Sequence, residues 1–229
     1  MEKFKIPYSK IIDKTNIIGK EIANGTESRV YEDKRNINNV IKSSWDLKEY
    51  NILKNIKHDN IISPIDWFVD KQEFSKVFYD IGRGYYGNGI LIENLLTYYV
   101  IYPRLEKITE IPSVSQIKEL ENSIKYLIDN NIVHNDIYID NIMKFNQKLC
   151  LIDFGNYENI LNAYDKDELY NKSILDLCKT IIYYIIESDS SFKYEEHDNI
   201  YHNWKLNKFS NLGELGQYIF HLMNFIKSD

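Results

Sequence analysis

Long apolar runs and clusters of basic residues are both absent from the 229-residue sequence. The first ten residues, MEKFKIPYSK, mix charged and apolar side chains, and later apolar runs are too short to span a bilayer, so we expect no membrane segment. The formal net charge is −6, and no tract of Lys and Arg is available to pair with phosphates. These absences argue against a nucleic-acid-binding protein.

Cysteine is also scarce, since Cys150 and Cys178 are the two in the chain. They lie far apart between apolar neighbours, which favours reduced core thiols over a disulfide or a metal site. The five His residues are scattered and form no zinc-type pattern. The sequence therefore predicts a soluble protein of a reducing, cytoplasmic compartment. Its richness in Ile, Asn, Lys and Tyr suits an A/T-rich genome, such as that of a large DNA virus or an endosymbiont; for a viral protein the location would be the host cytoplasm.

The first part of the chain has the pattern of short strands. Residues 17–41 carry β-type runs broken by Asn, Gly and Asp, which predicts hairpins. Asp46 and Glu49 have the spacing of a capping box, so we expect a helix from there to about Lys57. Further strand-like runs follow Ser63-Pro64 and end at residues 98–102, before a break at Pro103.

Beyond Pro103 the pattern becomes helical. Apolar residues recur at spacings of three and four, which predicts an amphipathic helix, at Ile117, Leu120, Ile124, Leu127 and Ile128. Two more helices are expected at 173–187 and after Leu212. The chain is therefore predicted to be a single α+β domain over residues 1–229, with a small β-rich first lobe (about 1–102) and a mainly helical second lobe (about 103–229).

The polar residues that could take part in catalysis or hold a metal ion are concentrated between His134 and Gly155. His134-Asn135-Asp136 is followed by Asn141 five residues after the Asp, and a short apolar strand then delivers Asp153-Phe154-Gly155 twelve residues after Asn141. The order and spacing resemble those of protein kinases, whose catalytic loop is H-x-D with an Asn five residues later, followed by a hairpin and D-F-G.

This resemblance implies a bilobal protein-kinase-like fold and an ATP- and magnesium-dependent phosphotransferase, most simply a Ser/Thr protein kinase with a protein substrate. Asp136 would be the catalytic base. Asn141 and Asp153 would hold magnesium against the phosphates, because hard cations prefer oxygen ligands. His134 would be structural.

The resemblance extends to the first lobe. Lys42 ends a Val-Ile-Lys strand and would contact the nucleotide phosphates, with Glu49 as its partner, although the short spacing leaves open that Glu49 only caps the helix. The glycine-rich loop of the family falls on four positions of which one is glycine, so a plain surface hairpin is the alternative; these positions are Ala23, Gly25, Ser28 and Val30. The literal G-x-G-x-x-G at 82–87 comes too late in the chain and is interpreted as a loop.

Four departures from the family pattern bear on the function. Asn135 replaces the Arg that receives an activation-loop phosphate in many kinases, so we expect no such regulation. Tyr138 replaces a Lys usual in Ser/Thr kinases, and Lys144 cannot be assumed to take its place. The short segment after Asp153 also suits a small-molecule kinase, whereas the degenerate glycine loop suits an inactive pseudokinase that acts as a binding module.

Overall fold

The computed structural model describes residues 6–25, 28–82, 96–160, 165–188, 216–219 and 221. Several sequence predictions lie outside these residues: the G-x-G-x-x-G motif after Gly82, positions 26 and 27 of the expected glycine loop, and most of the helix expected after Leu212. Two compact units make up the chain: the first comprises Met1–Lys57 and Ile62–Arg104, and the second His58–Ile61 and Leu105–Asp229. A single kinase-like domain with a lobe boundary near residue 102 stays a prediction.

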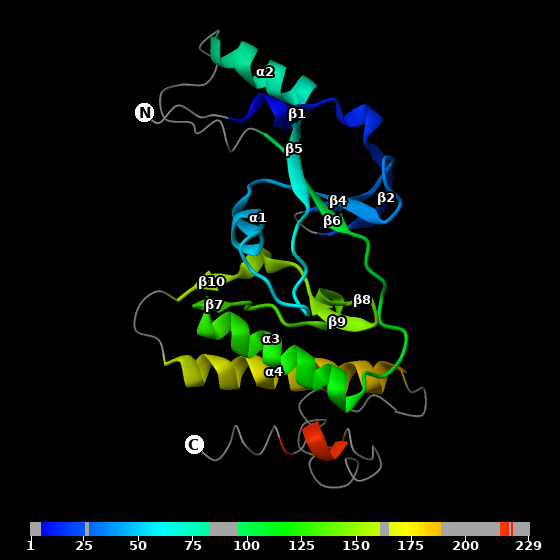
Figure 1. Ribbon diagram of the computed structural model, residues 1–229, viewed down its shortest axis with the longest axis vertical. Coiled ribbons are helices and arrows are strands. Elements are labelled where there is room, and N and C mark those ends of the chain that lie inside the picture. The colour runs from blue at the N-terminus through cyan, green and yellow to red at the C-terminus, as the bar shows by residue number, and fades with distance from the viewer. Residues whose placement is uncertain are drawn as a thin grey trace. The chain divides into compact units, whose positions relative to one another are not determined.

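The first unit is built on a six-stranded sheet in the order β1-β5-β6-β4-β3-β2 (Figure 1). All neighbouring pairs are antiparallel except β1 and β5, which are parallel. The strands are β1 (Ile11–Ile12), β2 (Ile18–Asn24), β3 (Arg29–Asp33), β4 (Asn39–Ser44), β5 (Asp66–Asp70) and β6 (Tyr98–Pro103). The predicted β-rich first part is therefore confirmed. The core on one face contains Ile17, Ile41, Phe68, Tyr99 and Ile101.

Two helices in this unit differ from the sequence prediction. Helix α1 (Lys48–Leu53) ends well before Lys57. The stretch after β5, expected to be strand, forms helix α2 (Lys71–Gly82), because its apolar residues recur at helical spacing; Val77 is buried in a cluster with Val69 and Leu96.

A polar network secures the start of the chain to α2 and β6. Lys14 Nζ lies 2.5 Å from Glu73 Oε1 and 3.0 Å from the Tyr99 hydroxyl, and the Lys14 backbone donates to the buried Asp70. Burial alone would lower the pKa of Lys14, but its bonds to Glu73 and Tyr99 raise it above the ordinary value. This lysine is therefore charged and anchors the segment that carries β1.

Two long helices dominate the described part of the second unit; the sequence predicted both, but the later one begins at Lys166 and not near residue 173. Helix α3 (Val114–Asp129) packs against α4 (Lys166–Ser188) (Figure 1). Ser113 begins α3 with a capping box, since its hydroxyl accepts from Gln116 N and the Gln116 side chain accepts from Ser113 N. The apolar stripe of α3 is buried as expected: Ile117, Leu120, Ile124, Leu127 and Ile128. The α+β fold class is confirmed.

Short strands beside these helices carry the polar loop. Strand β7 (Ile132–Val133) pairs with β10 (Glu158–Asn159), and β8 (Ile142–Phe145) forms a hairpin with β9 (Lys148–Leu151). Asn60 crosses to this hairpin, where its amide donates to Leu149 O at 2.8 Å, so the segment His58–Ile61 belongs with the second unit. No helix among the described ranges is both long and apolar enough to cross a membrane.

Candidate active site

The loop after β7 and the end of β9 bring Asp136 and Asn141 together in the second unit. The Asn141 amide Nδ2 donates to Asp136 O and Asp136 Oδ2, each at 3.0 Å. Asn141 ends the 3-10 helix Ile139–Asn141, directly before β8, and its own carbonyl accepts from Ile152 N at 3.0 Å. The amide therefore fixes the Asp136 carboxylate, and the backbone places Asn141 beside the residue that precedes Asp153.

His134 ties the Asp136 loop to the same strand end. Its ring is buried, and Nδ1 accepts from Asp136 N at 3.3 Å. Nδ1 must therefore be unprotonated, so Nε2 carries the hydrogen and donates to Ile152 O at 2.9 Å. The ring also packs on buried Phe154, with 4.4 Å between centroids. These contacts are those of a structural residue, which is the role that the resemblance implied.

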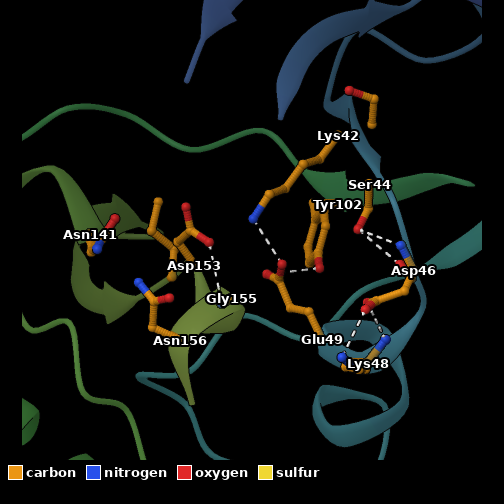
Figure 2. Close-up of polar contacts among 12 residues, drawn as sticks. Lys42, Ser44, Asp46, Lys48, Glu49, Tyr102, Asn141, Asp153, Gly155 and Asn156 are labelled. Carbon is orange, nitrogen blue, oxygen red and sulfur yellow. Dashed lines mark hydrogen bonds and ion pairs between the residues drawn. The ribbon is translucent and has the colours of Figure 1, made fainter. Parts of the chain in front are cut away.

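Asp153 lies in a sharply turned backbone. Its φ of 59° is left-handed, and its Oδ1 accepts from Gly155 N at 3.4 Å, which starts the short 3-10 helix Phe154–Asn156 (Figure 2). Asn135, next to Asp136, has a φ of 60°. Asp and Asn tolerate this conformation better than other residues that have a Cβ, and such strained positions concentrate at functional sites.

The donor set fits a magnesium ion. Because Asn141 uses Nδ2 for both bonds to Asp136, its Oδ1 is the atom left for a cation. Asp153 supplies a carboxylate from the neighbouring strand end. Amide and carboxylate oxygens are ligands that this hard cation accepts, with waters completing its shell. Both residues of the predicted metal pair therefore have suitable chemistry, and their role as ligands stays a proposal.

Asn156 is a site residue that sequence reasoning missed. Its Nδ2 donates to Asp136 Oδ2 at 3.4 Å, so two amides reach the same carboxylate oxygen. The bond is long, but hydrogen bonds of catalytic groups often tighten only when substrate is bound. The signal available in the sequence was an amide side chain directly after Asp153-Phe154-Gly155.

The first unit contains the second group of predicted residues. Lys42 Nζ lies 2.8 Å from Glu49 Oε2, and the Tyr102 hydroxyl donates to Glu49 Oε1 at 3.1 Å (Figure 2). Glu49 makes no capping box, because Ser44 Oγ, not Glu49, accepts from Asp46 N. The capping prediction is wrong: α1 has no side-chain cap, and the Glu49 carboxylate pairs instead with the largely buried ammonium group of Lys42.

The predicted glycine-loop residues lie at the end of the β2–β3 hairpin. Ala23 pairs with Val30, and Gly25 N donates to Ser28 O at 2.8 Å across the turn. A Cβ on Gly25 would meet Ser28 O at 3.4 Å, an ordinary contact, so the fold itself does not demand glycine there. A nucleotide-binding role for these four residues stays a prediction.

Asn135 and Tyr138 depart from the kinase pattern, and neither supplies the positive charge that the family has at its position. Asn135 Nδ2 lies 3.5 Å from Glu158 Oε2 of β10. Lys144 pairs with Glu110 at 2.6 Å. Tyr138 is 52% exposed. Because Lys144 is paired with Glu110, its contact does not support the idea that Lys144 substitutes for the lysine that Tyr138 replaces.

Comparison with known proteins identifies the family. Residues 20–197 match the model of the protein kinase domain, so the chain belongs to the protein kinase family. Over 109 residues it is 36% identical to the probable serine/threonine-protein kinase YbdM of Bacillus subtilis, covering 47% of this chain and 38% of the relative. It is 32% identical over 134 residues to the putative serine/threonine-protein kinase R436 of Acanthamoeba polyphaga mimivirus, covering 58% and 45%. The chain thus spans less than half the length of either relative.

Proposed function

We propose that this protein transfers the γ-phosphate of ATP, bound with magnesium, to a serine or threonine hydroxyl of a protein. The observation that carries the proposal is the Asp136 carboxylate held by the Asn141 amide, next to the strand end that bears Asp153. Membership of the kinase family and the Ser/Thr kinase names of the relatives support the reaction and the acceptor. A cytoplasmic location is part of the proposal.

Asp136 would act as the base. Two amides donate to its Oδ2, from Asn141 and Asn156, and no hydrogen bond reaches Oδ1 from the residues that the structure describes. Oδ1 is thus the oxygen suited to orient the acceptor hydroxyl and take its proton as the phosphoryl group is transferred.

The other predicted residues would hold the nucleotide. Magnesium, held by Asn141 and Asp153, would neutralise charge on the phosphate oxygens. Lys42, oriented by Glu49, would add a fixed positive charge for the phosphates. The backbone at the end of the β2–β3 hairpin would lie over the nucleotide phosphates, at Ala23, Gly25, Ser28 and Val30.

A second candidate is a small-molecule kinase. Helix α4 begins at Lys166, so few residues separate it from Asp153. Since protein substrates usually dock on the segment after the D-F-G motif, a short segment suits a smaller acceptor.

Acceptor identity can be tested directly. Purified protein is incubated with γ-labelled ATP and Mg²⁺, either with a generic protein acceptor or with a panel of hydroxylated metabolites. Phosphoserine or phosphothreonine in the acceptor supports the proposal. Label on a metabolite alone would favour the second candidate, and nucleotide binding without any transfer would favour a pseudokinase.

A further inference from the structure

The Glu49 carboxylate is held at both oxygens by residues of the sheet in the first unit. Lys42 Nζ lies 2.8 Å from Oε2, and the Tyr102 hydroxyl donates to Oε1 at 3.1 Å (Figure 2). The side chains of Lys42 and Glu49 are only 15% and 12% exposed, and Tyr102 is 8% exposed. The proposed function gives a task to Lys42 and Glu49 but none to Tyr102.

Helix α1 cannot hold Glu49 in place by itself. It has six residues, and its N-cap, Leu47, supplies no side-chain hydrogen bond. A helix this short is not stable on its own, because few of its hydrogen bonds offset the cost of nucleation. The orientation of Glu49 therefore depends on its contacts with the sheet.

Strand register places Tyr102 where it can serve as the second contact. On the β4–β6 ladder, Lys42 lies opposite Val100, and Val40 lies opposite Tyr102. Directly opposed residues and residues two apart project from the same face of a sheet, so Lys42 and Tyr102 share one face. Glu49 bridges these two side chains.

We propose that Tyr102 is a positioning residue for phosphate binding, acting through Glu49 on Lys42; this rests on the proposed function. With Lys42 alone, the carboxylate could turn about its terminal bond and move the ammonium group with it. The Tyr102 hydroxyl fixes Oε1, so Oε2 stays aimed at Lys42 Nζ. The lysine is then oriented before the nucleotide arrives, which lowers the entropic cost of binding the phosphates.

The test removes the hydroxyl and keeps the ring. Tyr102→Phe is expected to raise the Kd of a magnesium complex of a non-hydrolysable ATP analogue about tenfold, as one hydrogen bond to a charged group can. Calorimetric titration measures this Kd without any turnover. The same substitution in a Glu49→Ala background should cause no further loss, because Tyr102 acts through the carboxylate that is missing.

The same strand offers a matched control. The Tyr99 hydroxyl accepts from Lys14 at 3.0 Å and donates to Glu73 at 3.2 Å, in the network that secures the start of the chain. Tyr99→Phe is expected to lower the melting temperature and leave the Kd unchanged. A merely structural role for Tyr102 would make the two variants behave alike.

Different results of these measurements bear on the role of Tyr102 and on the proposed function. The inference is overturned if Tyr102→Phe binds like the wild type, if its effect persists without Glu49, or if Tyr99→Phe weakens binding equally. Wild-type protein that binds no nucleotide would contradict both this inference and the proposed function. Wild-type protein that binds nucleotide but transfers no phosphate would contradict only the proposed reaction, and the role of Tyr102 would still be measured.

Discussion

Lys42 and Glu49 form a largely buried ion pair with 2.8 Å between Nζ and Oε2, although they lie only seven residues apart in the chain. The connection is a tight turn, in which Ser44 Oγ donates to Asp46 O at 2.8 Å and Asp46 Oδ1 accepts from Lys48 N at 2.9 Å. The turn brings α1 back over the strand that carries Lys42. The short spacing is therefore compatible with the pair.

Removal of this pair should destabilise the protein. Glu49→Ala removes the carboxylate bonded to Lys42 Nζ in a largely buried site and is expected to lower the free energy of unfolding by about 2 kcal/mol, measured by urea titration. Lys48→Ala removes a nearby exposed pair with Asp46, whose lysine side chain is 77% exposed, and should cost less than about 0.5 kcal/mol. Equal losses in the two variants would show that burial of the Lys42 pair contributes nothing.

Asn156 should support the base through its amide. Asn156→Ala removes the donor and is expected to lower the rate of phosphate transfer about tenfold, with little change in nucleotide affinity. Asn156→Asp keeps the shape of the side chain but places a second carboxylate beside the Asp136 carboxylate. The rate of phosphate transfer should therefore fall further than in the Ala variant. Steady-state kinetics with varied ATP separates kcat from KM.

Asn122, which is exposed on α3, offers a control for that comparison. Asn122→Ala should retain the wild-type rate. If Asn156 only fills space, the isosteric Asp variant would keep more activity than the Ala variant, and this order would contradict the positioning role.

Both cysteines should be unreactive in the folded protein. They are buried and free, and burial raises the pKa of the Cys150 thiol to about 11 and that of Cys178 to about 12. Since the thiolate is the nucleophile, labelling by iodoacetamide at pH 8 should be slow until urea unfolds the chain. Rapid labelling of native protein would contradict this, and Cys150→Ala and Cys178→Ala variants would identify the thiol responsible.

The raised pKa values of the two thiols also make the stability of the folded protein depend on pH. In the unfolded chain the thiols ionise near their ordinary pKa of about 8.5, whereas in the folded chain they stay protonated to higher pH. Their contribution to stability is therefore complete below about pH 8.5 and is lost as the pH rises toward about 11. A double Cys→Ala variant should lose less stability over this range than the wild type, as measured by urea titration.

Periodicity predicted the helices of the second unit well. The apolar residues of α3 recur at three and four positions because one face packs against α4, and this regularity is present in the sequence itself. Helix α2 was missed although Phe74 and Val77 have the same spacing, because its apolar and aromatic residues were also typical of strands.

Contacts between distant residues could not be predicted in the same way. Lys14 bonds Glu73 and Tyr99, which are 59 and 85 positions away, and no local pattern encodes such pairs. The sequence motif between His134 and Gly155 could single out Asp136, Asn141 and Asp153 as candidate site residues, because their spacing is fixed by a loop and a hairpin. The orientation of Glu49 by Tyr102 depends instead on sheet register, which the sequence alone does not specify.

The most direct test of the proposed function is phosphate transfer by Asp136→Asn protein. With γ-labelled ATP, Mg²⁺ and a protein acceptor, the wild type should label serine or threonine, whereas Asp136→Asn should be at least about a hundredfold slower while still binding the magnesium nucleotide. Asp129→Asn, which changes an exposed acid on α3, should match the wild type. Undiminished transfer by Asp136→Asn would contradict the assignment of Asp136 as the base.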